Sequence, residues 1–330
     1  MSMLFSAAKV ASLDLKNRIV MSPMRTYSVQ KGDGVINPLH FAHYGARAVE
    51  QVGLVILEMT AVEPRGRTTE HDLGLWNDEQ GKELKRLVDF LHSLGTKVGI
   101  ELGHAGRKAK AEPVPVAPSL VEAYSDEYNE PSALSMAEIK RIQGAFVTAA
   151  KRAKQAGVDL IELQGAEGFL IDEFFSPLLN RRDDEYGGEL AGRYRFVQEI
   201  ITQIRDFYAG PLWVRLSLDD YAKEDEQNKL TEWQTIGRWL ERDGIDCLSI
   251  TTGGLFDKKP DHIYEGWQVP YATAMKKAVA LPIAVTGMLL DSKLCEYILE
   301  TKQADLILEA HVFDTNARWI VEAKKELYEK

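Results

Sequence analysis

The sequence predicts a closed (β/α)₈ barrel, a TIM barrel, formed by a single domain that covers residues 1–330. Eight short apolar segments alternate with eight longer amphipathic ones, as expected for parallel strands covered by helices. The chain is longer than the roughly 250 residues of a typical barrel, which leaves room for long loops. An open doubly wound sheet is disfavoured because no Gly-x-Gly-x-x-Gly pattern follows a predicted strand.

The predicted strands are short and rich in Val, Ile and Leu, which is typical of strands buried on both faces. They are Arg18–Met24, Leu54–Val62, Lys97–His104, Leu160–Gly168, Leu212–Asp220, Cys247–Gly254, Pro282–Met288 and Leu306–Phe313.

The predicted helices carry their apolar residues on one face, as Leu84, Leu87 and Leu91 do in the second of them. Ser135 begins a Ser-x-x-Glu capping box, and Gly157 stands where that helix would end. The predicted helices are Asn37–Val49, Asp78–Leu94, Ser135–Ala156, Arg193–Tyr208, Thr231–Arg242, Tyr271–Val279, Asp291–Thr301 and Thr315–Glu329.

Two long irregular segments, 107–131 and 178–192, follow the third and fourth predicted strands. Loops that follow barrel strands lie at the face that carries the active site in barrel enzymes. We therefore expect a small-molecule site at the C-terminal ends of the strands.

The net charge of −10 argues against nucleic acids and anionic membranes as partners. No uncharged apolar stretch of about 18 residues and no secretion signal is present, so we expect a cytoplasmic protein. Cys247 and Cys295 are the only cysteines, and no cluster of ligands suggests a metal site. A homo-oligomer is compatible with the sequence.

Three segments carry a specific resemblance: 15–24 (LKNRIVMSPM), 104–109 (HAGRKA) and 175–188 (FSPLLNRRDDEYGG). In this order they resemble the old yellow enzyme family, particularly its bacterial NADPH dehydrogenase (YqjM-like) branch. The resemblance runs from about Leu4 to Arg318. It implies a barrel that binds FMN in its mouth, takes hydride from NAD(P)H and passes it to the β-carbon of an activated alkene.

Several family positions are retained. The resemblance implies that Pro23 and Met24 lie beneath the flavin ring and that Tyr27 lies near the substrate. It implies that Arg215 donates to the N1/O2 edge of the ring and that the backbone of Gly287 faces the phosphate. The alternative for Arg215 is an interior arginine paired with a carboxylate.

Other positions that would contact the ring are changed. Arg25 stands where this branch carries a cysteine that tunes the flavin, and Met59 stands where the family carries a small residue. Glu101 replaces a glutamine that both donates to and accepts from the pyrimidine edge. An ionised carboxylate can only accept, so we expect the donor to be lost.

The substrate side is changed as well. Where the family carries two histidines, or a histidine and an asparagine, followed by a tyrosine, this chain has Gln164, Glu167 and Phe169. Ionised Glu167 would repel a developing oxyanion, so we expect ene reduction to be impaired. Together with Tyr27 and Arg25, Gln164 and Glu167 are the candidate catalytic residues.

At the phosphate end the family has Gly-Arg, and this chain has Ala310 and His311 preceded by Glu309. A carboxylate this close to a phosphate costs about a few kcal/mol at an effective dielectric constant of about 20. His311 would recover part of that only when protonated. We therefore expect a weakened FMN site.

Three hypotheses remain open. The first is an FMN-dependent NAD(P)H oxidoreductase with altered flavin and substrate sites. The second is a flavin-free paralogue, a pseudoenzyme or small-molecule binder, in which Arg25, Arg215, Glu101 and Glu167 form a buried charge cluster that fills the mouth. The third is a new acid/base enzyme that uses Glu101 and Glu167, with Arg25 and Lys108 as anion anchors.

Overall fold

Eight parallel strands form a closed barrel in the computed structural model, which describes residues 2–223, 226–310, 312–313, 316 and 318–328. The order around the barrel is β10-β11-β12-β3-β4-β5-β8-β9, which confirms the predicted fold class. The barrel strands are β3 (Ile19–Met21), β4 (Leu54–Ala61), β5 (Lys97–Gly103), β8 (Leu160–Gly165), β9 (Leu212–Ser217), β10 (Cys247–Thr251), β11 (Ile283–Val285) and β12 (Leu306–Glu309). Each lies within a predicted strand, and the residues that follow it belong to the loops of the mouth.

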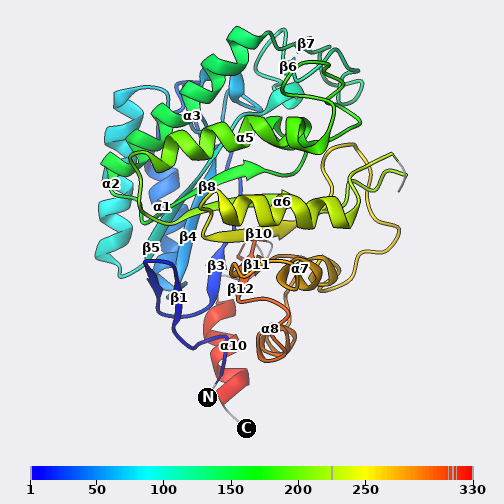
Figure 1. The fold of residues 1–330 in the computed structure, drawn as a ribbon. Coiled ribbons are helices and arrows are strands. Elements are labelled where there is room, and N and C mark those ends of the chain that lie inside the picture. Colours follow the sequence, from blue (N-terminus) through cyan, green and yellow to red (C-terminus); the bar gives the residue numbers. More distant parts are fainter. Residues whose placement is uncertain (1, 224–225, 311, 314–315, 317, 329–330) are drawn as a thin grey trace.

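Helices surround this barrel on the outside (Figure 1). The capping box of Ser135 and Glu138 forms as predicted, and Gly157 ends its helix with a φ of 84°. The helices that follow the strands are α1 (Pro38–Val49), α2 (Asp78–Ser93), α3 (Met136–Ala156), α5 (Leu190–Arg205), α6 (Leu230–Arg242), α7 (Val269–Lys276), α8 (Ser292–Glu300) and α10 (Trp319–Tyr328). Among the described residues, no helix is both long and apolar enough to cross a membrane.

A hairpin that the sequence reading did not predict closes the other end of the barrel. Strands β1 (Ala8–Val10) and β2 (Leu13–Leu15) pair antiparallel. The buried residues of this hairpin share one apolar cluster with Leu54, Leu160 and Trp213, which lie at the N-terminal ends of barrel strands. Figure 1 places β1 at the same end of the molecule as α10, opposite β6 and β7. The hairpin therefore covers the base of the barrel and leaves the C-terminal ends of the strands as the open end.

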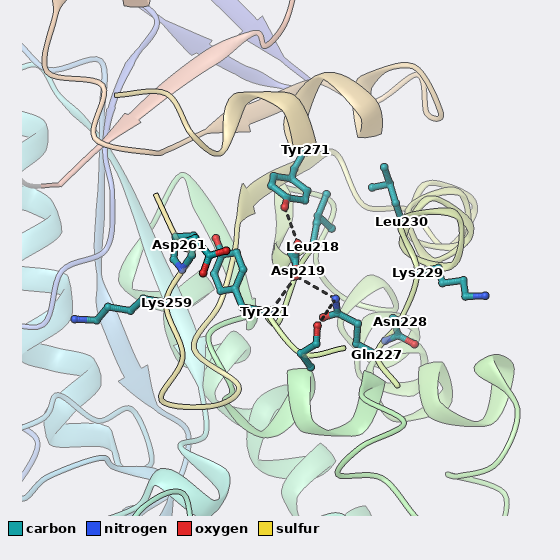
Figure 2. Close-up of a pocket in the computed structure, with 12 residues that line it drawn as sticks. Leu218, Asp219, Tyr221, Gln227, Asn228, Lys229, Leu230, Lys259, Asp261 and Tyr271 are labelled. Carbon is teal, nitrogen blue, oxygen red and sulfur yellow. Dashed lines mark hydrogen bonds between the residues drawn. The ribbon is translucent and has the colours of Figure 1, made fainter. Parts of the chain in front are cut away.

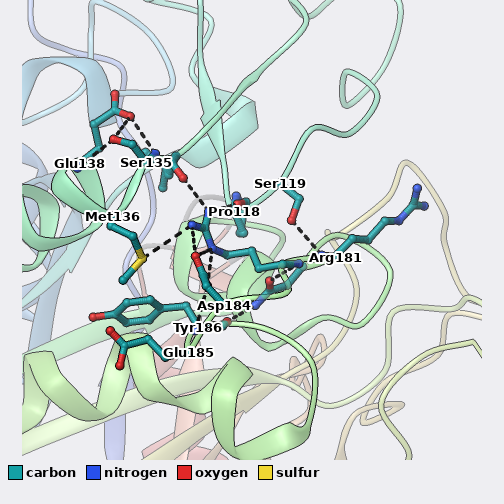
Figure 3. Close-up of polar contacts among 12 residues, drawn as sticks. Pro118, Ser119, Ser135, Met136, Glu138, Arg181, Asp184, Glu185 and Tyr186 are labelled. Carbon is teal, nitrogen blue, oxygen red and sulfur yellow. Dashed lines mark hydrogen bonds and ion pairs between the residues drawn. The ribbon is translucent and has the colours of Figure 1, made fainter.

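The longest motif in the sequence, 175–188, follows the short helix α4 (Leu170–Phe175) and acts as a clamp on the rim of the mouth (Figure 3). Arg182 donates to the carbonyl oxygens of Pro118 (2.5 Å) and Leu134 (2.6 Å), next to the short strands β6 (Val116–Ala117) and β7 (Ser132–Ala133). Its guanidinium also pairs with Asp184 at 2.5 Å. The motif therefore joins the loop after β8 to the loop after β5, and its role in this structure is to shape the rim.

Candidate active site

A cavity of about 380 Å³ lies at the C-terminal ends of β3, β4, β5, β8 and β12. This volume is at the lower end of the range for small-ligand pockets. Nine of the twelve predicted site residues line it, Arg215 and Gly287 do not, and His311 lies outside the described residues. The lining consists of Pro23, Met24, Arg25, Tyr27, Met59, Glu101, Gln164, Glu167, Phe169 and Ala310.

Two lining residues have left-handed backbone conformations, Tyr27 with a φ of 50° and Glu167 with a φ of 58°. Residues other than glycine rarely adopt this backbone conformation, and such strain concentrates at functional sites. The backbone of Glu167 is held on both sides. Its amide donates to Ser217 Oγ (2.9 Å), and its carbonyl accepts from Lys108 Nζ (2.7 Å). These contacts fix where the Glu167 carboxylate stands in the mouth.

Arg215 is the centre of a buried charge cluster directly below the cavity. Its Nε lies 3.3 Å from Glu101 Oε2 and 3.7 Å from Glu162 Oε1, and its Nη1 lies 3.5 Å from Glu167 Oε1. Its Nη2 donates to Ser22 Oγ at 2.6 Å. The arginine is 3% exposed, so its charge depends on these partners rather than on water.

Glu162 was missed by the sequence reading. It is fully buried and accepts a hydrogen bond from Ser249 Oγ. A signal was available, because Glu162 and Gln164 are two residues apart on β8. Alternate residues of a strand share a face, so both point into the barrel.

The acid–base state of Glu101 follows from this crowding. Burial raises the pKa of Glu101 well above its usual value, Glu162 and Glu167 add to the rise, and Arg215 opposes it. The neutral acid form is therefore favoured, and a neutral carboxyl carries an O–H donor. The expectation that Glu101 can only accept assumed an ionised group, and the neutral form would instead offer a donor.

Burial acts to lower the pKa of Arg215, but the three glutamates outweigh it and the pKa is raised. The arginine therefore stays charged at the base of the mouth, next to a neutral Glu101.

Arg25 does not join this cluster, so that part of the charge-cluster hypothesis is wrong. Its guanidinium donates to Thr68 Oγ1 (3.2 Å) and lies 5.1 Å from the ring centroid of Phe169 and 5.6 Å from that of Tyr27. Among the described residues, Arg25 forms no ion pair with a glutamate of the mouth. It is half-buried in the cavity wall, where the aromatic rings favour its charge.

Lys108 is not a free anion anchor either. Its Nζ donates to the carbonyl oxygens of Glu167 (2.7 Å) and Gly254 (2.5 Å) and lies 4.1 Å from the ring centroid of Tyr124. Burial lowers the pKa of Lys108 to about 8. The lysine ties the loop after β8 to the loop after β10 and does not line the cavity.

The remaining lining residues define what a ligand would meet. Gln164 accepts from the amide of Ala166 (2.9 Å) through its Oε1, which leaves its Nε2 to donate. Met59 is 3% exposed and clusters with Phe169. A Cβ at Gly103 would lie 2.6 Å from Met59 Cγ, so Met59 fills the space that this glycine leaves.

The loops after β11 and β12 form the far end of the mouth. Glu309 is 1% exposed and accepts from the amide of Leu289 at 2.8 Å. Burial raises the pKa of Glu309 to about 7, although the amides of Leu289, Ala310 and Val312 all favour its charged form. Gly287 has a φ of 130°, and its carbonyl accepts from the amide of Gly266. His311 lies outside the described residues.

These residues fit one part of FMN and not the other. The apolar wall of Met24, Met59 and Phe169 suits a flat ring, and a neutral Glu101 could donate to its edge. The phosphate does not fit, because the backbone amides that would donate to it already interact with the Glu309 carboxylate. Among the described residues, those at the phosphate end therefore do not fit the phosphate of FMN.

A second cavity, of about 460 Å³, lies between the loops after β9 and β10 (Figure 2). Its polar centre is Asp219, which accepts from Tyr271 Oη (2.6 Å), the amide of Tyr221 (2.8 Å) and Gln227 Nε2 (3.2 Å). This carboxylate is satisfied by its own chain, so we place the site in the mouth. Among the described residues, no group of three or more His, Cys, Asp or Glu could hold a metal ion.

Comparison with known proteins agrees with the fold. The sequence model of the NADH:flavin oxidoreductase / NADH oxidase family matches residues 3–330. An NADPH dehydrogenase of Listeria welshimeri is 45% identical over 308 residues, which are 93% of this chain and 90% of that protein. One of Halalkalibacterium halodurans is 42% identical over 324 residues, 98% and 94% of the two chains.

Solved structures share the architecture. Morphinone reductase matches with a TM-score of 0.84 at 25% identity and covers 98% of this chain and 90% of its own. A complex of 2-naphthoyl-CoA reductase with 2-naphthoyl-CoA matches with a TM-score of 0.91 at 23% identity, over 99% of this chain and 52% of that one. The second likeness concerns the fold alone.

Proposed function

Because this chain belongs to the NADH:flavin oxidoreductase / NADH oxidase family, the family of old yellow enzyme, we propose that it is an NAD(P)H:flavin oxidoreductase with an exchangeable flavin. The observation that carries this proposal is the mouth cavity, which is lined by the apolar side chains of Met24, Met59 and Phe169 and by Glu101, which pairs with Arg215. Relatives of similar length are NADPH dehydrogenases, which supports NADPH as the reductant. The filled phosphate end supports weak and reversible binding of the ring.

The substrate side supports a change of substrate within this class. Gln164 Nε2 is the group best placed to donate to a ligand oxygen, whereas the Glu167 carboxylate faces Arg215 at 3.5 Å. Phe169 offers no hydroxyl. Gln164 would act in place of a preorganised pair of donors, so we expect slow reduction of activated alkenes and faster reduction of an added electron acceptor.

The test is NADPH oxidation by the purified protein with no flavin, with FMN and with riboflavin. We expect oxidation only when a flavin is added. The variant Ala310→Phe fills the cavity and should lose that activity. The variant Asp219→Asn alters the second cavity and should keep it. If neither flavin supports oxidation by the wild-type protein, the proposal is wrong.

A flavin-free barrel that binds another small molecule is the second candidate. One observation favours it: the counter-charges of Arg215 all come from Glu101, Glu162 and Glu167, so the mouth needs no charged ligand. This candidate predicts that neither flavin binds. The acid/base hypothesis keeps the raised pKa of Glu101 in its favour, but Lys108, its second anchor, is engaged by backbone carbonyls.

A further inference from the structure

Glu309 occupies the place where barrels of this type bind phosphate. In TIM barrels the loops after the seventh and eighth strands commonly form a phosphate site from backbone amides. Here those strands are β11 and β12. The Glu309 carboxylate accepts from the amide of Leu289, and the amides of Ala310 and Val312 act to lower its pKa. The carboxylate of Glu309 therefore stands where a bound phosphate would stand.

The charge of this carboxylate has no cationic partner among the lysines and arginines of the described residues. Among the residues that the structure describes, no lysine or arginine forms an ion pair with Glu309, and nearby Glu265 repels it. Within the described part of the chain, backbone amides favour its charged form, as they favour a bound anion in a nest. This set of backbone amides therefore suits an anion, and the carboxylate of Glu309 occupies the place of that anion.

Glu309 does not line the ligand cavity, but the residue that follows it does. Ala310 lines the mouth, and its amide belongs to the set that faces Glu309. A ligand whose ring lay in the mouth and whose phosphate reached this end would meet a buried negative charge and amides already in use. Like charges repel strongly where water is excluded.

We propose that Glu309 determines ligand specificity by filling the anion site of the mouth, so that the protein accepts a flavin ring without a terminal phosphate and disfavours FMN. The part of this proposal that names a flavin ring as the ligand rests on the proposed function. The filled anion site rests on the contacts of Glu309 alone.

The anion site can be tested without any flavin. Sulfate and inorganic phosphate are the probes, and the readout is the thermal midpoint at pH 8 against chloride at equal ionic strength. Glu309→Ala should gain a midpoint that rises with probe concentration, because a ligand that binds only the folded state stabilises it. The wild-type protein should show no rise. Glu309→Gln keeps an acceptor for Leu289 and should show a smaller rise, which covers the case in which the alanine variant does not fold.

The matched control is Glu265→Gln. Glu265 is exposed and lies close enough to act electrostatically on Glu309, so the variant removes one nearby negative charge without opening the site. It should behave as the wild-type protein does. Equal responses of all four proteins to sulfate, or a strong response of the wild-type protein, would overturn the filled anion site.

A second experiment compares the dissociation constants of FMN and riboflavin. We expect the wild-type protein to bind riboflavin more tightly, and Glu309→Ala to bind FMN at least about tenfold more tightly with riboflavin nearly unchanged. An equal change for both flavins overturns the specificity role. If no flavin binds any variant, the proposed function is wrong, and the sulfate response alone decides whether Glu309 fills an anion site.

Discussion

Arg215 and Glu101 form the floor of the mouth, with Nε and Oε2 3.3 Å apart and both side chains almost fully buried. Glu162 and Glu167 complete the cluster around the arginine. One positive charge faces three carboxyl groups, so the arginine is worth more to stability than any single glutamate is.

The first prediction compares the two ends of this pair. Arg215→Met should cost about 3–5 kcal/mol of unfolding free energy, because it leaves buried carboxyls without their cation. Glu101→Gln should cost less than about 1 kcal/mol, because a neutral amide replaces a largely neutral acid of the same shape. Denaturant unfolding of both variants measures the difference. Equal losses would mean that Glu101 is ionised in the folded protein.

A second prediction concerns pH. Burial raises the pKa of Glu58 to about 7, against hydrogen bonds from Thr26 and Tyr44 that lower it. The folded protein therefore binds more protons than the unfolded chain above pH 4.5, and stability falls as pH rises through 7. The buried Glu173, whose pKa burial raises to about 8 against the opposing effect of Arg107, acts in the same direction.

Comparison of the wild-type protein with Glu58→Gln from pH 6.5 to 9 isolates this effect, because Glu309 and Lys108 also titrate in this window in both proteins. His40 and His43 have pKa values lowered to about 4 by burial, so they act only at lower pH. The unfolding free energy of the wild-type protein should decrease across this window, and that of Glu58→Gln should decrease less steeply. Parallel curves would show that Glu58 does not titrate there.

The third prediction tests the altered cofactor contacts together. The triple change Glu101→Gln, Ala310→Gly and His311→Arg should increase FMN affinity, and adding Glu309→Ala should increase it further. Titration of each protein with FMN, followed by flavin fluorescence, measures both steps. If affinity stays unchanged, Met59 is the obstacle, and Met59→Ala in the same background should then restore binding.

The rim clamp gives a fourth prediction. Arg182→Ala removes two hydrogen bonds to backbone carbonyls and the pairing with Asp184, and should cost about 2–4 kcal/mol. Arg181→Ala is the control, since that side chain is exposed and points away from the clamp (Figure 3). It should change stability by less than about 0.5 kcal/mol. Similar losses for both variants would contradict the clamp.

The barrel was predictable because each strand is a short apolar run followed by an amphipathic helix. The hairpin of β1 and β2 was not, because strands of three residues such as Ala8–Val10 are too short for a periodic signal. Their pairing depends on the barrel base that they cover.

The site was predictable in position and less so in detail. Motif resemblance placed Glu101 and Glu167 in the mouth, and the structure brings both to Arg215. The separation of Arg25 from that cluster depends on the direction of a long side chain, which the sequence does not specify. The raised pKa of Glu101 comes chiefly from its burial, and Glu162, whose inward direction follows from the two-residue period of β8, adds to it.

The most direct measurement is a titration of the purified, dialysed wild-type protein with riboflavin and with FMN. We expect protein that carries less than one flavin per chain after dialysis, then binds added riboflavin saturably at one site and FMN more weakly. Protein that retains one FMN per chain through dialysis would contradict the exchangeable flavin and the filled phosphate end. Protein that binds neither flavin would contradict the oxidoreductase assignment.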